Sequence, residues 1–407
     1  MSKNDKQHAL VPRLRFPEFR KLPGWNESAL TGICDVNPSH DGLPESFYYI
    51  DLESVEAGTL RNPKRIERAN APSRAQRYLR DGDILYQTVR PYQRNNLLFD
   101  FGAEDDYVAS TGYAQLRAGE SIGFLYQLIH TDSFVERVLA KCTGSNYPAI
   151  KSSDLESVSI CIPPDAAEQR KIADCLGSLD DWIAAEGRKL EALRDHKKGL
   201  MQQLFPREGK TRPRLRFPEF RDAPEWERFL LEQLEDERRI ELGRGKVISH
   251  DDMRANPGPH PVYSSSVIDN GLMGTYGDYL FDEELISWSV DGGGHFFYRP
   301  KHKFSITNVS GFIRVLSDDI ICQFLAYQLQ RLHASETFNY VQKAHPSVIR
   351  TLYTVGLPDS SEQQRIADCL SAIDALITTQ AEKINALRIH KRGLMQQLFP
   401  SPEDAEV

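Results

Sequence analysis

The chain has 407 residues, which predicts two or three structural units, and its 40% hydrophobic and 27% charged content is typical of a globular protein. No run of about 18 apolar residues is present, which excludes a membrane-spanning helix, and the N-terminus lacks the apolar core of a secretion signal. The net charge of −8 argues against a uniformly basic surface, although binding depends on where positive charge collects. The cysteines form no CxxC pair and no zinc-type cluster. We therefore expect reduced thiols, a cytoplasmic protein, and neither a metal nor a cofactor.

Two segments of the chain occur twice. PRLRFPEFRKLPGW at 12–25 returns as PRLRFPEFRDAPEW at 213–226, and the segment 164–206 returns at 358–400 with 25 of 43 aligned positions identical. The stretches between these repeats share little, so the repeated parts should do one job twice and the others two different jobs. The predicted order is a flexible tail (1–11), a variable domain (12–163), a helix (164–206), a variable domain (207–357), a helix (358–400) and a flexible tail (401–407).

The first variable domain contains a basic stretch. Residues 48–55 and 81–96 are predicted to form strands and loops. The stretch from Arg61 to Arg94 contains nine Lys or Arg residues and three acidic residues. Arg, Asn and Gln are the side chains that read base edges, which makes these residues candidate DNA contacts: Tyr86, Gln87, Arg90, Tyr92, Arg94, Asn95 and Asn96. Candidate phosphate contacts are Lys64, Arg65, Arg74 and Arg77. A solvated surface loop is the alternative.

A loop before the first long helix is a second candidate contact region. It spans 143–155 and contains Ser145, Asn146 and Lys151. In the second variable domain the equivalent stretch, 342–352, contains Lys343 and His345. Short strands broken by glycines fill 262–304, where the candidate contacts are Ser264, Ser265, Ser266, His295 and Arg299. Plain connecting loops are the alternative for both regions.

The repeated segments 164–206 and 358–400 are predicted to be long helices. Pro164-Asp165 with Glu168 gives a helix start, and Pro206 gives a stop. Apolar residues follow at alternating spacings of four and three, interrupted at Glu186 and Lys197 in one copy and at Gln380 and Lys391 in the other. This heptad pattern predicts a coiled coil, within the chain or between two copies of it. We favour pairing within the chain, because the two helices are nearly identical.

Both helices end in the same motif, HKKGLMQQLFP and HKRGLMQQLFP. Apolar side chains beside exposed glutamines could dock a partner protein, and the duplication then predicts two copies of that partner. The candidate partner contacts are Leu200, Met201, Gln202, Phe205, Leu394, Met395, Gln396 and Phe399. Packing of the helix end on its own domain is the alternative.

No familiar catalytic motif is present. The sequence contains no GxxxxGK[ST], GxGxxG, HExxH or GxSxG, and neither Asn37-Pro38-Ser39 nor Asn256-Pro257-Gly258 matches the Asn-Pro-Pro-aromatic motif of amino-methyltransferases. We therefore expect no catalytic residues in this chain.

The alternation of variable domains with EQxxIAxxL helices that end in KxGLMQQLF resembles the specificity (S) subunit of type I restriction–modification systems. The likeness runs from Pro12 to Pro400. It implies an α+β fold with two mixed α/β target-recognition domains, joined by two long antiparallel coiled-coil helices in a pseudo-twofold repeat. Each domain would read one half of a bipartite target in double-stranded DNA, and the helices would set the gap. The implied partners are two modification (methyltransferase) subunits and ATP-dependent restriction subunits, with no membrane partner.

Two other functions stay open at this point. A divergent DNA adenine methyltransferase would bind S-adenosylmethionine by itself. A helical scaffold protein would select no sequence from random duplexes.

Overall fold

The computed structural model describes residues 10–56, 58–102, 104–119, 121–144, 146–266, 268–290, 294–334, 336 and 344–400. The chain divides into two compact units: unit 1 comprises the residues up to Gly187 and those from Lys383 onward, and unit 2 comprises Arg188–Glu382. Of the predicted tails, 1–9 and 401–407 lie outside the described residues. Leu10 forms a backbone bridge with Trp25.

Unit 1 contains two four-stranded sheets, with strand orders β2-β11-β8-β9 and β6-β3-β10-β7. Their strands are β2 (Asp35–Val36), β3 (Ser46–Ile50), β6 (Lys64–Glu67), β7 (Ala75–Tyr78), β8 (Asp83–Gln87), β9 (Leu97–Phe99), β10 (Tyr107–Ser110) and β11 (Tyr113–Arg117). The pairs β4 (Val55–Glu56) with β5 (Thr59–Leu60) and β1 (Asn26–Ala29) with β12 (Ser159–Ile162) complete the strands described in this unit, and the short helices are α1 (Ile122–Leu128), α2 (Asp132–Lys141) and α3 (Ser152–Glu156). Every residue of β8 is buried, because neighbours cover both of its faces.

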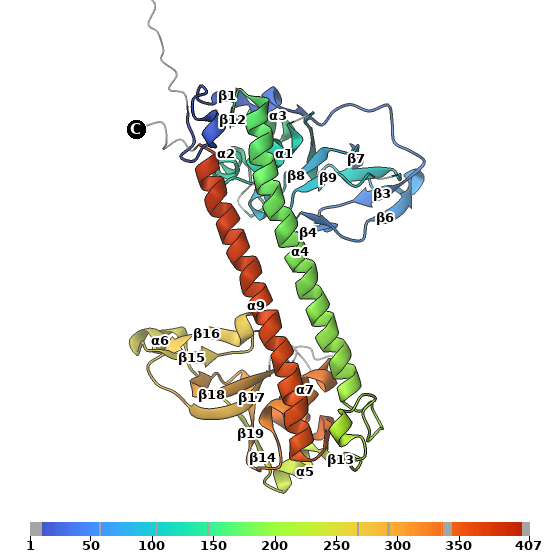
Figure 1. Cartoon of the computed structure of the whole chain (residues 1–407), viewed down its shortest axis with the longest axis vertical. Helices are drawn as coiled ribbons and strands as arrows, with labels where there is room; N and C mark the ends of the chain where they lie inside the picture. Colours follow the sequence, from blue (N-terminus) through green and yellow to red (C-terminus); the bar gives the residue numbers. More distant parts are fainter. Residues whose placement is uncertain are drawn as a thin grey trace, which may run out of the picture. The chain divides into compact units, whose positions relative to one another are not determined.

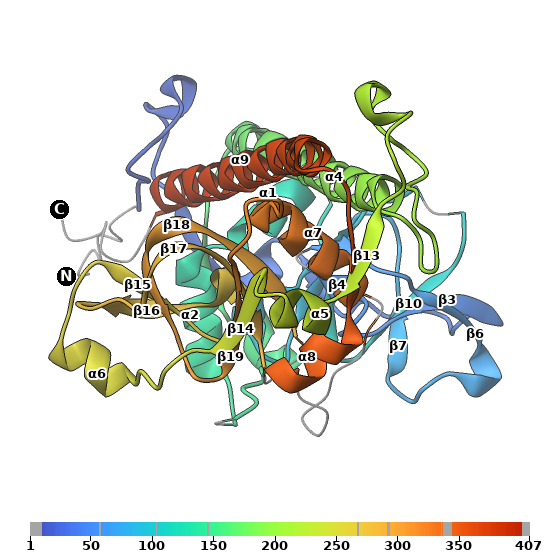
Figure 2. The same ribbon diagram turned by 90° about the horizontal axis from the view of Figure 1, so that it is seen from below.

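Unit 2 is built on one six-stranded sheet with the order β14-β19-β17-β18-β15-β16. These strands are β14 (Ile240–Arg244), β15 (His260–Tyr263), β16 (Leu272–Tyr276), β17 (Phe281–Ser289), β18 (Phe296–Ile306) and β19 (Ser310–Val315). A separate pair joins β13 (Glu227–Leu230) to β20 (Thr354–Leu357), and the short helices are α5 (Leu231–Asp236), α6 (His250–Ala255), α7 (Cys322–His333) and α8 (Pro346–Leu352). Within this unit α7 packs between the sheet and the long helices, as Figure 2 shows.

The two repeated segments form the long helices α4 (Ala166–Leu204) and α9 (Ser360–Leu398), each of 39 residues. Within each unit these helices lie side by side (Figure 1) and run antiparallel, because the first part of one pairs with the last part of the other. In unit 2 the Lys197 ammonium lies 2.6 Å from a carboxylate oxygen of Asp374, and in unit 1 Lys391 lies 2.6 Å from Asp180. These pairs occupy equivalent repeat positions. The α+β fold with two long antiparallel helices confirms the predicted fold class. Two of the four polar interruptions of the heptads, Lys197 and Lys391, form interhelical ion pairs.

The same frame holds the leading segment in both units. Arg15 donates two hydrogen bonds of 2.7 Å to Glu168 near the start of α4, and Arg216 makes the equivalent bonds of 2.8 and 2.6 Å to Glu362 near the start of α9. All four side chains are at least 92% buried. Paired in this way, the buried charges are compensated and the leading segment is fixed to its helix. The duplicated Arg and Glu thus build the same structure twice.

The end of each long helix packs into the core of the unit that it enters. In unit 1 the ring of Phe399 lies 5.9 Å from Trp25 and 5.4 Å from Phe124, measured between ring centroids. In unit 2 Phe205 lies 6.1 Å from Trp226 and 5.3 Å from Phe324. Unit 1 is therefore completed by the C-terminal end of α9, and unit 2 by the end of α4.

Candidate nucleic-acid interface

Two loops predicted to contact DNA lie side by side in unit 1. The loop 88–96, between β8 and β9, forms a backbone bridge from Val89 to Ala149 of the loop before α3. The Arg90 amide donates to the Pro148 carbonyl (2.7 Å), and the Ile150 amide donates to the Thr88 carbonyl (3.0 Å). We call the accessible part of this surface the loop face. It comprises the half-buried Arg90 and five exposed residues: Tyr92, Gln93, Asn146, Tyr147 and Lys151.

An arginine and a tyrosine form the centre of the loop face. The Arg90 guanidinium carbon lies 4.3 Å from the Tyr147 ring centroid, and the Tyr147 side chain is 63% exposed. Tyr92 is 50% exposed on the same loop. An exposed aromatic ring can make apolar contact with a thymine methyl group, and a guanidinium held over a ring keeps donors free for base edges or phosphates. Sequence reasoning missed Tyr147, because a lone tyrosine in a loop carries no periodic signal.

Three of the predicted contacts, two at the end of β8 and one at the end of this loop, are buried, and the structure corrects them. Tyr86, Gln87 and Asn96 are 1%, 4% and 1% exposed. Tyr86 packs against Phe134, and burial raises the pKa of its hydroxyl. The Gln87 amide nitrogen donates to the Val89 carbonyl (2.7 Å), and the backbone amide of Gln87 donates to Asn96 Oδ1 (2.9 Å). The side chains of Gln87 and Asn96 therefore fix the loop backbone. Tyr86 and Gln87 are buried because β8 is an interior strand with both faces covered.

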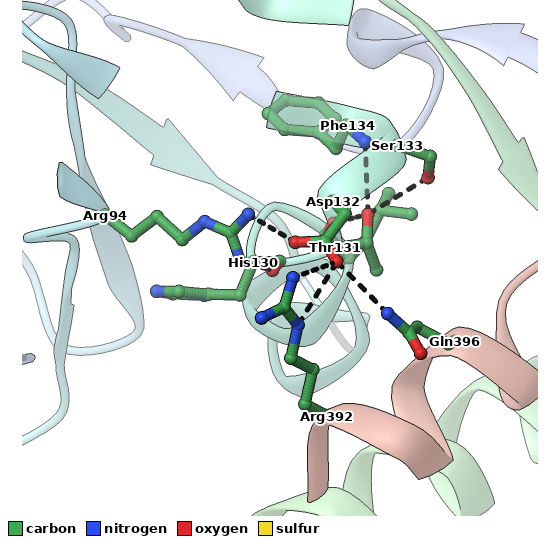
Figure 3. Close-up of polar contacts among 9 residues, drawn as sticks. Arg94, His130, Thr131, Asp132, Ser133, Phe134, Arg392 and Gln396 are labelled. Carbon is green, nitrogen blue, oxygen red and sulfur yellow. Dashed lines mark hydrogen bonds and ion pairs between the residues drawn. The ribbon is translucent and has the colours of Figure 1, made fainter. Parts of the chain in front are cut away.

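Arg94 ends the loop in a polar cluster at the start of α2 (Figure 3). Its Nη2 donates to Asp132 Oδ1 (2.6 Å) and its Nη1 to the His130 carbonyl (2.9 Å). Arg392 of α9 donates to the other oxygen of Asp132 at 2.9 and 3.3 Å, and Gln396 donates to it at 3.3 Å. Partial burial alone would raise the pKa of Asp132, but these hydrogen bonds lower it to about 2. Arg94 is thus partly exposed, but its guanidinium already donates hydrogen bonds within unit 1.

Next to this cluster is a groove of about 840 Å³, lined by residues of the domain and of both long helices. His130 is half-buried beside it, and loss of hydration lowers the pKa of the His130 imidazole to about 4. The neutral ring can then donate from Nδ1 to the Tyr126 carbonyl (2.6 Å) and accept from the Asn96 amide at Nε2 (3.3 Å). The ring therefore connects α1 with the end of the loop. Asn95 next to it is half-buried, and its backbone amide donates to Gln87 Oε1 (3.2 Å).

The predicted phosphate contacts fall on two opposite edges of one sheet. Arg77 lies on β7 and Arg74 directly precedes it, and the Arg74 carbonyl accepts from the Thr111 amide beside the loop face (2.8 Å). Lys64 and Arg65 lie on β6, at the other edge of the four-stranded sheet. Three strand spacings separate these edges, about 14 Å. Arg74 and Arg77 therefore adjoin the loop face and the β6 pair does not. Burial lowers the pKa of Arg77, whose Nε donates to the Tyr113 carbonyl (3.4 Å).

In unit 2 the structure corrects the prediction for Arg299, which is 4% exposed. Its guanidinium carbon lies 3.8 Å from the Tyr263 ring centroid and 4.8 Å from that of Phe297. It donates to Ser287 Oγ (2.9 Å) and to the Asn270 carbonyl (2.7 Å). Burial lowers its pKa to about 10. Arg299 therefore holds the loop before β16 in place.

The other candidates of unit 2 are accessible to different degrees. His295 and His345 are both exposed. They lie on neighbouring loops, because the Ala344 amide donates to the Val290 carbonyl (3.1 Å) and the Ser289 amide donates to the His295 carbonyl (3.2 Å). Ser266 is exposed, whereas Ser264 and Ser265 are half-buried. Lys343 and, in unit 1, Ser145 lie outside the described residues.

Residues 55–195 and 225–388 match the protein family described as the type I restriction modification DNA specificity domain. These two stretches span most of the chain. The chain belongs to this family. The resemblance to type I specificity subunits is confirmed, and the two matches correspond to the two halves of the internal repeat.

Individual members of the specificity family support this assignment. The chain is 38% identical over 134 residues to an N-terminal type I specificity subunit sequence of Mycoplasma pneumoniae, which is 32% of this chain and 71% of that protein. It is 31% identical over 157 residues to the MpnII specificity subunit of the same organism, which is 38% of this chain and 47% of that protein. The matched stretch is therefore about half the length of some curated relatives.

Two solved structures share the fold of this specificity-family chain. The type I S subunit from M. genitalium superposes with a TM-score of 0.60 at 15% identity, covering 96% of this chain and all of the other. A chain from a structure on the assembly and conformational transition of a type I R-M system gives 0.53 at 22% identity, covering 93% and 98%. In the part of the chain that the structure describes, none of the helices combines the length and the apolar character that a membrane-spanning helix needs.

The ends of the two family helices correct part of the predicted partner surface. Phe205 and Phe399 are 0% and 5% exposed, and Met395 is 9% exposed. Leu200, Met201 and Leu394 are half-buried, and Gln202 and Gln396 are exposed. The apolar side chains pack inside the two units because each helix end closes a core, and the glutamines are left at the surface.

Proposed function

We propose that this chain is the DNA sequence-recognition subunit of a type I restriction–modification complex. Residues 12–163 and 207–357 would be its target-recognition domains, each reading one half of a bipartite site in double-stranded DNA. The helices 164–206 and 358–400 would set the gap between the half-sites. In this proposal methyl transfer and cleavage belong to the modification and restriction subunits, and the chain works in the cytoplasm, where its thiols stay reduced.

The observation that carries the proposal is a duplicated frame that holds two unlike surfaces. The buried Arg–Glu pair, the aromatic cluster and the interhelical Lys–Asp pair occur in both units at equivalent repeat positions. The domains mounted on this frame differ, with two four-stranded sheets in unit 1 and one six-stranded sheet in unit 2. Reading two different short sequences requires different contact surfaces, and the identical supports would hold both surfaces in the same way.

The proposed partner surface is the outward face of the long helices. Trp182 of α4 and Leu376 of α9 occupy equivalent repeat positions and are 48% and 56% exposed. Gln202 and Gln396 are equivalent as well, and both are exposed. Large exposed apolar side chains often mark protein contacts. Their duplication supports the binding of two copies of one modification subunit.

A selection from random duplexes tests the proposed function. The full chain, assembled with its modification subunits, should enrich two unrelated short sequences separated by a constant gap. A helical scaffold would enrich no sequence. A methyltransferase would bind S-adenosylmethionine as the purified chain alone, and such binding would refute the non-catalytic assignment.

We expect Arg90→Ala and Lys151→Ala to weaken DNA binding in different ways. Loss of a base contact by Arg90 should cost about 1–3 kcal/mol on the selected duplex, with a smaller effect on random duplex. Loss of a phosphate contact by Lys151 should weaken both similarly and reduce the salt dependence by about one ion. Titrations at several salt concentrations measure both effects. If Arg90→Ala binds both duplexes as the parent does, the loop face is not the reading surface.

A further inference from the structure

The loop face carries a backbone conformation that its own sequence does not favour. Arg90 and Arg94 bracket a short helical turn at Pro91–Gln93, and both have left-handed backbone angles with φ of 54°. Left-handed geometry is unfavourable for residues other than glycine and persists where surrounding contacts fix it. Tyr92 and Gln93, the exposed residues of the loop face between them, therefore depend on those contacts for their direction.

One of the two bracketing residues is fixed by a carboxylate that also binds a long helix. Asp132 accepts from Arg94 through Oδ1 (2.6 Å) and from Arg392 through Oδ2 (2.9 Å), as Figure 3 shows. Asp132 is itself held at the first position of α2, where Thr131 Oγ1 accepts from the Phe134 amide (3.3 Å). Charge-assisted bonds of this kind are short and directional. We call Asp132, Arg94 and Arg392 together the Asp132 clamp.

The charges around the clamp leave Asp132 as the carboxylate shared by the two arginines. Lys391, one residue before Arg392, is already paired with Asp180 at 2.6 and 2.7 Å. Without the Asp132 charge, Arg94 and Arg392 would face each other with no shared anion. The loop would then lose its connection to α9, although its backbone contacts to residues 148–150 would stay.

The clamp belongs to one half of the repeat. The residue equivalent to Arg392 in α4 is Lys198, and among the described residues Lys198 has no ion-pair partner. Arg392 uses both Nε and Nη2 on one oxygen of Asp132, an arrangement that the single ammonium of lysine cannot reproduce. The change from lysine to arginine between otherwise matching motifs, HKKGLMQQLFP and HKRGLMQQLFP, thus coincides with the presence of the clamp.

We propose that Asp132 is a positioning residue for the reading of one half-site: by joining Arg94 to Arg392 and Gln396, it makes the direction of the loop face depend on the end of α9. The proposal rests on the proposed function and goes beyond it. Asp132 contacts no DNA in this scheme. It sets which way Tyr92 points, whereas the Gln93 side chain is also held by Gln87, whose Nε2 donates to Gln93 Oε1 (3.0 Å). Loss of Asp132 therefore reduces discrimination between bases more than it reduces binding to phosphates.

The test compares four substitutions in the full chain assembled with its modification subunits. The probes are the selected duplex and single-base variants in each half-site. For Asp132→Asn we expect at least tenfold weaker discrimination in one half-site and unchanged discrimination in the other. Asp132→Glu keeps the charge and should restore most of it, and Arg392→Lys should be intermediate. Lys198→Arg, the matched change in the first repeat, should have no effect.

The outcomes separate this proposal from the proposed function. If the parent chain selects no split site, the proposed function fails and the proposal fails with it. If the parent selects a split site and Asp132→Asn reads both halves as the parent does, the clamp proposal alone is overturned. Equal loss in both halves, or equal loss in the Lys198→Arg control, would also overturn it. Hydrogen exchange of α2 shows whether Asp132→Asn is folded, and Arg392→Lys provides the test if it is not.

Discussion

Replacing Phe399 by alanine is expected to lower the free energy of unfolding of unit 1 by about 3–5 kcal/mol, the usual cost of removing a buried aromatic ring. The ring is 5% exposed and packs against Trp25 and Phe124. Because it closes the core of unit 1 from the C-terminal end of the chain, its loss should loosen β1, β12 and α1. Hydrogen exchange measured by mass spectrometry reads this effect segment by segment.

Phe205→Ala is the matched variant in unit 2, where the ring is fully buried beside Trp226 and Phe324. It should reduce protection of β13, β20 and α7 and leave unit 1 as before. Ile389→Ala, at a 64% exposed position of α9, should change stability by no more than about 0.5 kcal/mol. Equal loss of protection in both units from either phenylalanine variant would contradict the division of the chain into two cores.

Lengthening both long helices is expected to change the gap in the DNA site and leave both half-sites as they are. Four residues inserted after Gly187 in α4 and four after Ala381 in α9 lie at equivalent repeat positions, between the contacts of the two units. They add about 6 Å at 1.5 Å per residue. With about 3.4 Å between successive base pairs, the selected gap should grow by about one to two base pairs.

The insertion in α4 alone is the control for this experiment. It leaves α9 at its original length, so the added turn must bulge and the gap should stay as it was. Both variants keep the Lys197–Asp374 and Lys391–Asp180 pairs, which lie outside the inserted positions. A parent-length gap in the double insertion, measured by the same duplex selection, would show that the helices do not set the spacing.

The repeated parts of the fold could be predicted from the sequence because their signals are local and occur twice. The heptads, the helix caps and the closing prolines are each read within a few residues of one another, and duplication separates them from chance. The sequence did not show whether Phe205 and Phe399 pack in a core or dock a partner protein. A buried core residue and a docking residue look alike in sequence, and each ring packs against partners far away in the chain, such as Trp25.

The candidate site could be predicted only as a region. The loops 88–96 and 146–150 do lie together, but the sequence did not separate reading residues from residues that support them. Tyr86 and Gln87 have side chains suited to base contacts and are nevertheless buried in β8. Arg94 could not be assigned to Asp132 from the sequence, because the pairing depends on how α2 packs against α9. The net charge of −8 was uninformative about a local surface formed by Arg90, Tyr147 and Lys151.

The most direct test of the central claim is a domain exchange measured by duplex selection. Residues 26–163 are replaced by the corresponding variable domain of another family member, and the leading segments and both long helices are kept. The account predicts that one half of the selected site changes to that of the donor, while the other half stays as in the parent. A change in both halves, or the loss of any split site from a folded protein, would contradict two independent recognition domains on one duplicated frame.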